Sequence, residues 1–416
     1  MLPLFDELLL PLVFSLFSGA GKIEPIDIEP ALPLCTHLIY GYAVVDGNNN
    51  QLTPRDVYID EDAPHKGYFK KVTGLKARHP GLRVLLSVGG GADQAGEKTK
   101  YLTLLETPDS RAAFVQSARA LLKKYNFDGL DLAWQFPQIK EKRDRGTFGN
   151  IWHKVKKTFS GSSKDDKEEE HRDGFTALVR ELRQALRGDG YMLSLGVLPH
   201  VNSTIYYDYR VIAPLVDQIH LLSTDFVTPE RVPQEADYSA PLFYVHDRKS
   251  YQNVDSFVRR WLENGVDAFK LIVGVPTFGR SWALTSDSAI SGVPPIVADG
   301  PGEQGTVTKT PGQLAWQETC LLLKTGDKSR DGPDRILRKV TDPSKRLGSY
   351  GFKAYQKDAP GLWVSYEEPD TAAYKAAYVK GKQLGGIALL DLSLDDPRGV
   401  CGNGEFPILK AAKNAL

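Results

Sequence analysis

The sequence predicts an α/β fold, a (β/α)8 TIM barrel with an inserted α+β domain between the seventh strand and the helix that follows it. Three observations lead to this prediction. Short apolar runs rich in β-branched residues recur at even intervals, amphipathic helical patterns separate them, and one long stretch interrupts the alternation. A chain of 416 residues is long enough for one such barrel and its insertion.

The predicted strands are near-continuous apolar runs, which is typical of parallel strands buried on both faces. Helical patterns, such as those at 109–125 and 173–187, lie between them. Repeated strand and helix units form a parallel sheet covered by helices, so a barrel fits best and a doubly wound sheet is the alternative. The runs begin at Thr36, Leu82, Phe127, Tyr191, Val216, Phe269 and Gly385.

Two stretches depart from this rhythm. Residues 283–355 are rich in Gly, Pro and charge and too long for one loop, so we assign them to the inserted domain and leave 27–282 and 356–416 to the barrel. Residues 138–172 carry a basic run and then an acidic one, which favours a solvated helix or loop over a partner-binding surface. We expect His153 and His171, within that stretch, to be exposed.

The first 26 residues form an atypical N-terminus with two interpretations. The apolar run LLLPLVFSLFS is followed by small residues, with Ser18 and Ala20 spaced as in a signal-peptide cleavage site, but no positively charged region precedes it. Alternatively, the run is the first barrel strand, although Pro11 fits poorly in a central strand. No other stretch is long and apolar enough to cross a bilayer.

Composition narrows the function classes. Lys plus Arg and Asp plus Glu both number 52, so no net field attracts nucleic acid or an anionic membrane. Of the three cysteines, we expect Cys320 and Cys401 to form a disulfide, and the state of Cys35 stays open. The sequon at Asn202 is a candidate glycosylation site and supports secretion weakly.

A glycine-rich segment, LLSVGGGADQAGEKT, has a spacing close to that of a phosphate loop. Gly91 and Gly96 match the two glycines of that loop, but Glu97 displaces the following lysine and hydroxyl by one residue. We therefore interpret the segment as a turn at the C-terminal end of a barrel strand and expect no nucleotide site.

The stretch FDGLDLAWQFP, residues 127–137, is more informative. Side chains alternate along a strand, so Asp131, Ala133 and Gln135 point the same way, toward the C-terminal mouth where barrel enzymes keep their active sites. Taken alone, the stretch is also consistent with an ordinary strand whose end happens to be acidic.

This stretch resembles the signature FDGxDxDWEYP of the family 18 glycoside hydrolases, the chitinases. SVGG at 87–90, GVPTFGRSW at 274–282 and GGIALLDLSLDD at 385–396 resemble other strand motifs of that family, in the same order. In the family, the last acidic residue of the signature protonates the glycosidic oxygen. The aspartate two positions earlier orients the N-acetyl group that acts as nucleophile.

At these two positions the present chain has Gln135 and Ala133. A glutamine amide can donate a hydrogen bond but cannot deliver a proton near neutral pH, and alanine cannot hold an acetamido group. Two further departures weaken the sugar site: Thr224 replaces a tyrosine, and Leu390 replaces a tryptophan that stacks under the sugar. The resemblance therefore implies a protein without hydrolase activity and no catalytic residues, with Asp128 and Asp131 left over from the signature.

The Ala and Gln of LDLAWQFP, the insertion with TFSG and EEEH, and the runs TPERVPQEADYSAPLF and WVSYEEPDTAA resemble the insect imaginal disc growth factors. These are secreted chitinase-like proteins, so the resemblance implies an extracellular growth factor with roles in cuticle and wound responses. Family members pair a first-strand cysteine with one at the position of Cys35, whereas this chain has no cysteine before Cys35.

Two alternatives stay open: an extracellular lectin for chitin or N-acetylglucosamine oligomers that organises matrix, and a residual hydrolase using Asp128 or Asp131. We expect a monomer with no cofactor, no metal and no nucleic-acid partner, an unidentified cell-surface receptor, and chitin-type glycans as candidate ligands. The competing interpretation of Asp128 and Asp131 is that backbone or hydroxyl donors hydrogen-bond to them and that they have no role in a site. For the aromatic candidates the competing interpretation is packing in the core. The candidate ligand-binding residues are Tyr40, Trp134, Gln135, Asp225, Arg280 and Trp363.

Overall fold

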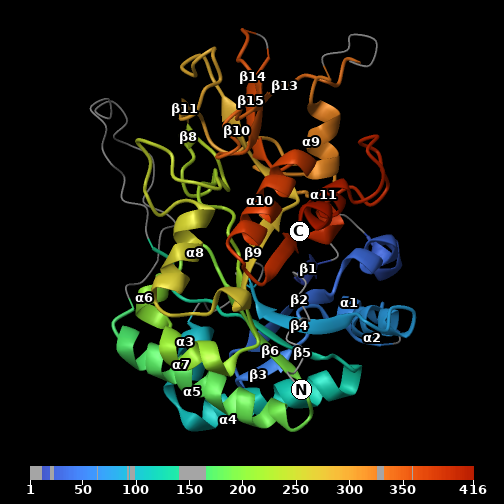
Figure 1. Cartoon of the computed structure of the whole chain (residues 1–416), viewed down its shortest axis with the longest axis vertical. Coiled ribbons are helices and arrows are strands. Elements are labelled where there is room, and N and C mark those ends of the chain that lie inside the picture. Colours follow the sequence, from blue (N-terminus) through green and yellow to red (C-terminus); the bar gives the residue numbers. More distant parts are fainter. Residues whose placement is uncertain are drawn as a thin grey trace, which may run out of the picture.

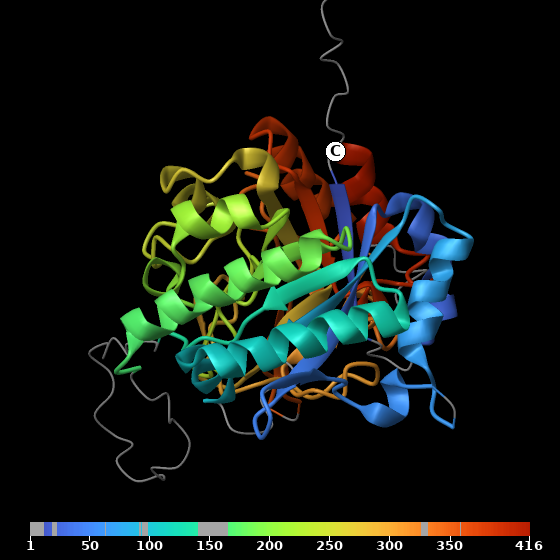
Figure 2. The same cartoon turned by 90° about the horizontal axis from the view of Figure 1, so that it is seen from below.

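The computed structural model describes residues 12–18, 23–62, 64–90, 93, 99–139, 165–325, 332–357 and 359–416. The fold prediction is confirmed: parallel strands form a closed barrel and helices surround it (Figures 1 and 2). Going round the barrel, the strands are β1 (Leu12–Phe17), β2 (His37–Asp46), β4 (Arg83–Gly89), β5 (Gly129–Ala133), β6 (Met192–Val197), β7 (Gln218–Leu221), β9 (Leu271–Pro276) and β16 (Gly386–Leu390).

Strand β1 closes the barrel, because it pairs in parallel with β16 on one side and with β2 on the other. Its side chains Val13, Phe14 and Phe17 are fully buried. Of the two interpretations of the N-terminal run, the structure thus places Leu12–Phe17 as a barrel strand. Pro11 lies outside the described residues.

The helical patterns fold as their end signals indicate. Helix α4 (Pro108–Tyr125) has a proline in its first turn, and the Thr107 hydroxyl caps it by accepting from the Ser110 amide. Helix α5 (Glu168–Arg187) begins with three glutamates, which suit the positive end of the helix dipole. The remaining helices are α1 (Val57–Asp60), α2 (Tyr68–Gly74), α3 (Lys100–Glu106), α6 (Ser203–Tyr206), α7 (Tyr209–Ile212), α8 (Val254–Glu263), α9 (Trp316–Leu322), α10 (Pro369–Gly381) and α11 (Pro407–Ala415).

Short 3-10 helices and two minor strand pairings complete the described structure. The hairpin strand β3 (Gln51–Thr53) pairs antiparallel with the end of β2, and β8 (Glu235–Ala236) pairs with β11 (Ile296–Val297). The 3-10 helices are η2 (Pro25–Leu34), η3 (Leu75–Ala77), η4 (Ala213–Leu215), η5 (Ala268–Lys270) and η6 (Leu392–Leu394). Among the described residues, no helix is both long enough and apolar enough to cross a membrane.

The inserted part follows β9 and precedes α10, and it sits above the barrel in Figure 1. Its antiparallel sheet has the order β12-β10-β15-β14-β13. Two of these strands depart from the predicted range 283–355, since β10 starts before it, at 278, and β15 lies wholly after it, at 361–366. The domain division itself stays a prediction. The strands are β10 (Phe278–Leu284), β12 (Gln313–Ala315), β13 (Arg338–Thr341), β14 (Ser349–Lys353) and β15 (Gly361–Tyr366).

The predicted disulfide is present. Cys320 on α9 is bonded to Cys401, which precedes α11, with the two Cα atoms 5.8 Å apart. The bond ties the inserted part to the C-terminal segment of the barrel. Cys35 follows η2, and its thiol donates to the Ala31 carbonyl.

The charged stretch at 138–172 is described at its two ends. The expected exposure of His171 is wrong: the side chain is buried, with Nδ1 2.8 Å from an Asp165 carboxylate oxygen. Asp165 also accepts from the Tyr206 hydroxyl. Burial by itself raises the pKa of Asp165, but the hydrogen bonds from His171, the backbone and Tyr206 outweigh it and lower the pKa below its usual value. His153 lies outside the described residues.

Candidate functional site at the barrel mouth

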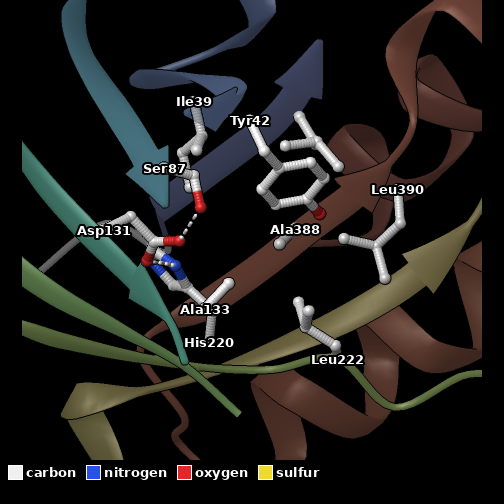
Figure 3. Close-up of a pocket in the computed structure, with 10 residues that line it drawn as sticks. Ile39, Tyr42, Ser87, Asp131, Ala133, His220, Leu222, Ala388 and Leu390 are labelled. Carbon is white, nitrogen blue, oxygen red and sulfur yellow. Dashed lines mark hydrogen bonds and ion pairs between the residues drawn. The ribbon is translucent and has the colours of Figure 1, made fainter. Parts of the chain in front are cut away.

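A pocket opens among the C-terminal halves of the barrel strands, where enzymes of this fold keep their active sites. Its empty volume is about 310 Å³, part of it open solvent. Figure 3 shows a polar group on one side, formed by Ser87, Asp131 and His220, and apolar side chains around it. The lining residues are Leu16, Ile39, Tyr42, Ser87, Asp131, Ala133, His220, Leu222, Ala388 and Leu390.

Asp131 is the centre of the polar group, and its three side-chain partners come from the adjacent strands β4 and β6 and from β7, the next strand beyond β6. It accepts hydrogen bonds from the hydroxyls of Ser87 on β4 and Ser194 on β6, both at 2.7 Å, and lies 3.0 Å from His220 Nδ1 on β7. Burial by itself raises the pKa of Asp131, but the hydrogen bonds and the charge of His220 outweigh it, so the pKa is lowered and the carboxylate stays ionised.

His220 is held rigidly inside the barrel. Its exposed fraction is 1 %, and the Phe14 ring lies 4.5 Å from its ring. Since an ionised carboxylate can only accept, Nδ1 carries the proton in the contact with Asp131. His220 Nε2 is buried and has no hydrogen-bond partner among the described residues. Sequence reasoning did not single out His220, although a histidine in a buried strand run was the available signal.

The two signature positions differ in place and contacts. Ala133 ends β5 and lines the pocket, whereas Gln135 lies two residues further and is half-buried. The Gln135 side-chain amide donates to the Gly90 carbonyl, and the Gly90 amide donates to the Ala133 carbonyl at 2.8 Å. Gln135 is therefore tied to the end of β4. Neither Asp131 nor Gln135 can act as a general acid. The Asp131 carboxylate is ionised and only accepts hydrogen bonds, and the Gln135 side chain is an amide that does not release a proton near neutral pH.

Tyr42 occupies the opposite wall and was missed by the sequence analysis. A Cβ on Gly90 would lie 2.3 Å from the Tyr42 ring, so the ring packs directly on that glycine. Burial, together with the nearby carboxylates of Asp131 and Asp391, raises the pKa of the Tyr42 phenol. It therefore remains a neutral hydroxyl at ordinary pH.

Tyr40 does not line the mouth, and this part of the prediction is wrong. Its ring packs on Phe17 and Phe69, and its hydroxyl donates to Asp60 at 2.6 Å. The register of β2 against β4 shifts between Gly41 and Ala43, and this irregularity brings Tyr42 into the mouth while Tyr40 stays on the helix-facing side.

Two tryptophans are also core residues rather than mouth residues. Trp134 follows Ala133 and so points to the other face of the strand, where Tyr101 and Phe114 contact its ring edge to face. Trp363 lies in the inserted sheet, stacked on Tyr350, and its Nε1 donates to the Gly292 carbonyl at 3.0 Å. Both side chains are fully buried, so predicting them in the mouth was wrong.

Asp225 and Arg280 form a bidentate pair beyond β7. Arg280 Nε and Nη2 each lie 2.7 Å from one oxygen of Asp225, which has a φ of 59° in the left-handed region. Burial by itself lowers the pKa of Arg280, but the Asp225 carboxylate outweighs it and raises the pKa. Contact of this pair with a ligand stays a prediction.

The remaining predicted residues are placed as follows. Asp128 lies before β5, at the opposite end from the mouth, and accepts from the Val84 amide and from Lys76. Thr224 is buried, and its hydroxyl has no partner within the described residues. The side-chain oxygen Oδ1 of Asn202 accepts from the Thr204 amide and hydroxyl, and glycosylation of Asn202 stays a prediction. No group of His, Cys, Asp and Glu in the described part is arranged to hold a metal.

Comparison with known proteins identifies the family of this chain. The sequence profile of the glycosyl hydrolases family 18 matches residues 17–395. The chain belongs to this family. It is also 50% identical over 407 residues to "Bacteria-responsive protein 1" of Aedes aegypti, covering 97% of this chain and 92% of the relative.

Other relatives carry growth-factor and chitinase-like names. "Chitinase-like protein Idgf4" of Drosophila melanogaster is 48% identical over 405 residues, covering 96% of this chain and 91% of the relative. "Imaginal disk growth factor 6" of the same organism is 44% identical over 410 residues, covering 96% and 90%. The chain is thus an imaginal disc growth factor-like, chitinase-like member of glycosyl hydrolase family 18.

Solved structures agree with the fold. Catalytic domain 2 of the Group II chitinase of Ostrinia furnacalis has a TM-score of 0.78 and 29% identity, covering 97% of this chain and 96% of that chain. A mutant of the same domain, solved in complex with penta-N-acetylchitooctaose, has a TM-score of 0.79 and the same identity and coverage.

Proposed function

We propose that this chain is a secreted chitinase-like growth factor that promotes cell proliferation and does not hydrolyse chitin. One observation carries the absence of hydrolysis: Ala133 and Gln135 stand at the two signature positions that hold the acetamido group and protonate the leaving group in active family members. The Gln135 amide donates a hydrogen bond to the Gly90 carbonyl, and Asp131 has no proton to donate because its carboxylate is ionised. General acid catalysis contributes about 10²- to 10⁴-fold in such enzymes, so its loss removes most turnover.

The growth-factor part of the proposal rests on the names of relatives that are 44 to 48% identical over nearly the whole chain. The proposed roles in cuticle and wound responses rest on the same kinship, and a cell-surface receptor would be the partner. Secretion is supported by the disulfide between Cys320 and Cys401, which is a feature of oxidising compartments.

Cell culture tests this proposal. Purified protein is added to cultured insect cells, and the increase in cell number is measured against dose. We expect a saturable increase that heat-denatured protein does not produce. A folded, monodisperse preparation that leaves cell number unchanged at every dose would contradict the growth-factor assignment.

A second candidate is a lectin for chitin-type glycans that organises extracellular matrix. It is supported by polar side chains that follow the C-terminal ends of β5 and β7, namely Gln135 and the Asp225–Arg280 pair. The Ostrinia furnacalis domain was crystallised with such an oligosaccharide. Calorimetric titration with N-acetylglucosamine oligomers separates the candidates, because proliferation without sugar binding would exclude a role limited to matrix.

A further inference from the structure

The chain that leads from β10 into β11 presents aliphatic side chains to solvent. Ile290 is 86% exposed, Val293 61% and Val297 54%, and the three lie within eight residues. Single apolar residues are common on protein surfaces, but several gathered on one short segment mark a contact with another protein or with a membrane. We refer to residues 289–297 as the aliphatic segment. It belongs to the inserted part, away from the barrel strands (Figure 1).

The inserted sheet holds the aliphatic segment in place. Trp363 Nε1 donates to the Gly292 carbonyl at 3.0 Å, and Arg338 Nη2 donates to the Ser291 carbonyl at 2.7 Å. Gly292 has a φ of 72°, and a Cβ there would lie 2.5 Å from the Phe352 ring, so a larger residue would prevent this close packing. The segment is thus ordered before any partner arrives, which lowers the conformational entropy lost on binding.

The exposed side chains are not part of the core. Along β11, Ile296 is only 1% exposed and packs in the core of the inserted part with Trp282 and Trp363, whereas the next residue, Val297, faces solvent. Folding therefore requires an apolar side chain at 296 and leaves position 297 open to a polar one. The aliphatic character of the outer face needs a reason other than the stability of the fold.

Carboxylates surround the aliphatic segment. Asp287 and Asp299 flank it along the chain and are exposed, and exposed Glu235 is the cross-strand neighbour of Val297 in the pairing of β8 with β11. Arg338 is the cation that the described contacts place on the segment, and its guanidinium lies over the Phe352 ring as well as on the Ser291 carbonyl. The rim therefore carries more negative than positive charge.

This charge decides among three possible occupants. The anionic surface of a membrane would repel the carboxylates of the rim. A second copy in a two-fold symmetric contact would bring each acidic rim against the same acidic rim. A different protein, with an apolar hollow and Lys or Arg side chains beside it, complements both the aliphatic side chains and the carboxylates.

We propose that the aliphatic segment is the docking surface for a cell-surface protein, which receives Ile290 and Val293 in an apolar hollow and places basic side chains against Asp287 and Asp299. The location of this partner on the cell surface rests on the proposed growth-factor function. Binding to cells and growth of cells are therefore measured separately, so that either proposal can fail without the other.

Binding to intact cultured insect cells tests the surface. Fluorophore-labelled protein is titrated onto the cells and followed by flow cytometry, and we expect saturable binding that disappears when trypsin has removed the surface proteins. Ile290→Ser and Val293→Ser should each weaken the affinity about tenfold, as expected of central interface residues. The matched controls Ile26→Ser and Val57→Ser, at positions 56% and 51% exposed elsewhere on the molecule, should bind as wild type does.

Charge reversal tests the rim. Asp299→Lys should slow association with the cells about tenfold at low salt, and this difference should shrink as salt is added, because screening weakens attraction between the two surfaces. Circular dichroism checks that each variant is folded, which exposed positions favour.

The outcomes separate the two proposals. Wild-type protein that binds cells without increasing their number would contradict the growth-factor assignment and leave the docking surface supported. Equal affinity of wild type, Ile290→Ser and Val293→Ser for cells would overturn the docking surface, even if the cells proliferate. Absence of saturable binding would overturn it too, as would binding to vesicles of phosphatidylcholine and phosphatidylserine, or a dimer in sedimentation that Ile290→Ser dissociates.

Discussion

The lower and upper halves of the inward face of β5 differ in what surrounds them. Below, Asp131 is tied to Ser87, Ser194 and His220, and all four side chains are at least 95% buried. Above, Ala133 makes no polar side-chain contact, and Gln135 holds a backbone carbonyl. The lower half stabilises the barrel whether or not a reaction takes place. The upper half has no acidic side chain at these two positions.

The difference separates the part of the strand that the fold needs from the part that faces the open mouth. Replacing a residue of the buried polar network would leave its partners without hydrogen bonds in a low-dielectric interior, at a high cost in stability. Replacing a residue at the open end removes a function but leaves few groups unsatisfied. Four variants test this comparison through the free energy of unfolding, and they follow from the largest expected effect to the smallest.

Asp131→Ala should cause the largest loss. It leaves the hydroxyls of Ser87 and Ser194 and the His220 ring buried without their common acceptor. We expect the free energy of unfolding in urea to fall by about 3–5 kcal/mol. A loss below about 1 kcal/mol would show that the network does not stabilise the barrel.

Asp131→Asn tests the charge alone, because it keeps the shape. The lowered pKa means that the ionised carboxylate contributes stability above its unfolded pKa, near 3.8, and that this contribution disappears as pH falls through the lower folded pKa. Wild-type protein should exceed the variant by about 2 kcal/mol at neutral pH, and the gap should shrink below pH 3.8. A gap that widens on acidification would contradict the lowered pKa.

Arg280→Ala probes the ion pair at the mouth. Removing the guanidinium leaves the Asp225 carboxylate, which is partly exposed to water, so the loss should be about 1.5 kcal/mol in the free energy of unfolding. Arg280→Lys, which keeps the charge but not the fork, serves as control and should lose less. Equal losses in the Ala and Lys variants would show that charge plays no part.

Gln135→Ala should have the smallest effect. It removes one hydrogen bond to the Gly90 carbonyl, so the free energy of unfolding should fall by about 0.5–1 kcal/mol. Thermal unfolding followed by circular dichroism suffices as the measurement. A loss as large as that of Asp131→Ala would erase the contrast between the two halves of the strand.

The barrel and the direction of Asp131, Ala133 and Gln135 could be predicted from the sequence, since both follow from the burial of parallel strands and the alternation of side chains. The same alternation, applied to Trp134, would have placed it in the core. The mouth position of Tyr42 could not be predicted, because it depends on a local shift in register between β2 and β4.

The positions of two other residues could not be predicted from sequence patterns. His171 stands in a charged run that reads as surface, yet Asp165 and Tyr206 surround it in the fold, and their approach depends on tertiary packing. Trp363 belongs to a motif that resembles the family, but its strand pairs with β10 and β14 of the inserted sheet. A motif gives the order of elements, and strand pairing decides which side chains reach the mouth.

Hydrolysis of a fluorogenic chitotriose tests the central claim most directly. Wild-type protein, Asp131→Asn and the double variant Ala133→Asp/Gln135→Glu are assayed beside an active family 18 chitinase. The account predicts no turnover above background for wild-type protein or Asp131→Asn. Turnover by wild-type protein that disappears in Asp131→Asn would contradict it, because the lower half of β5 would then carry chemistry.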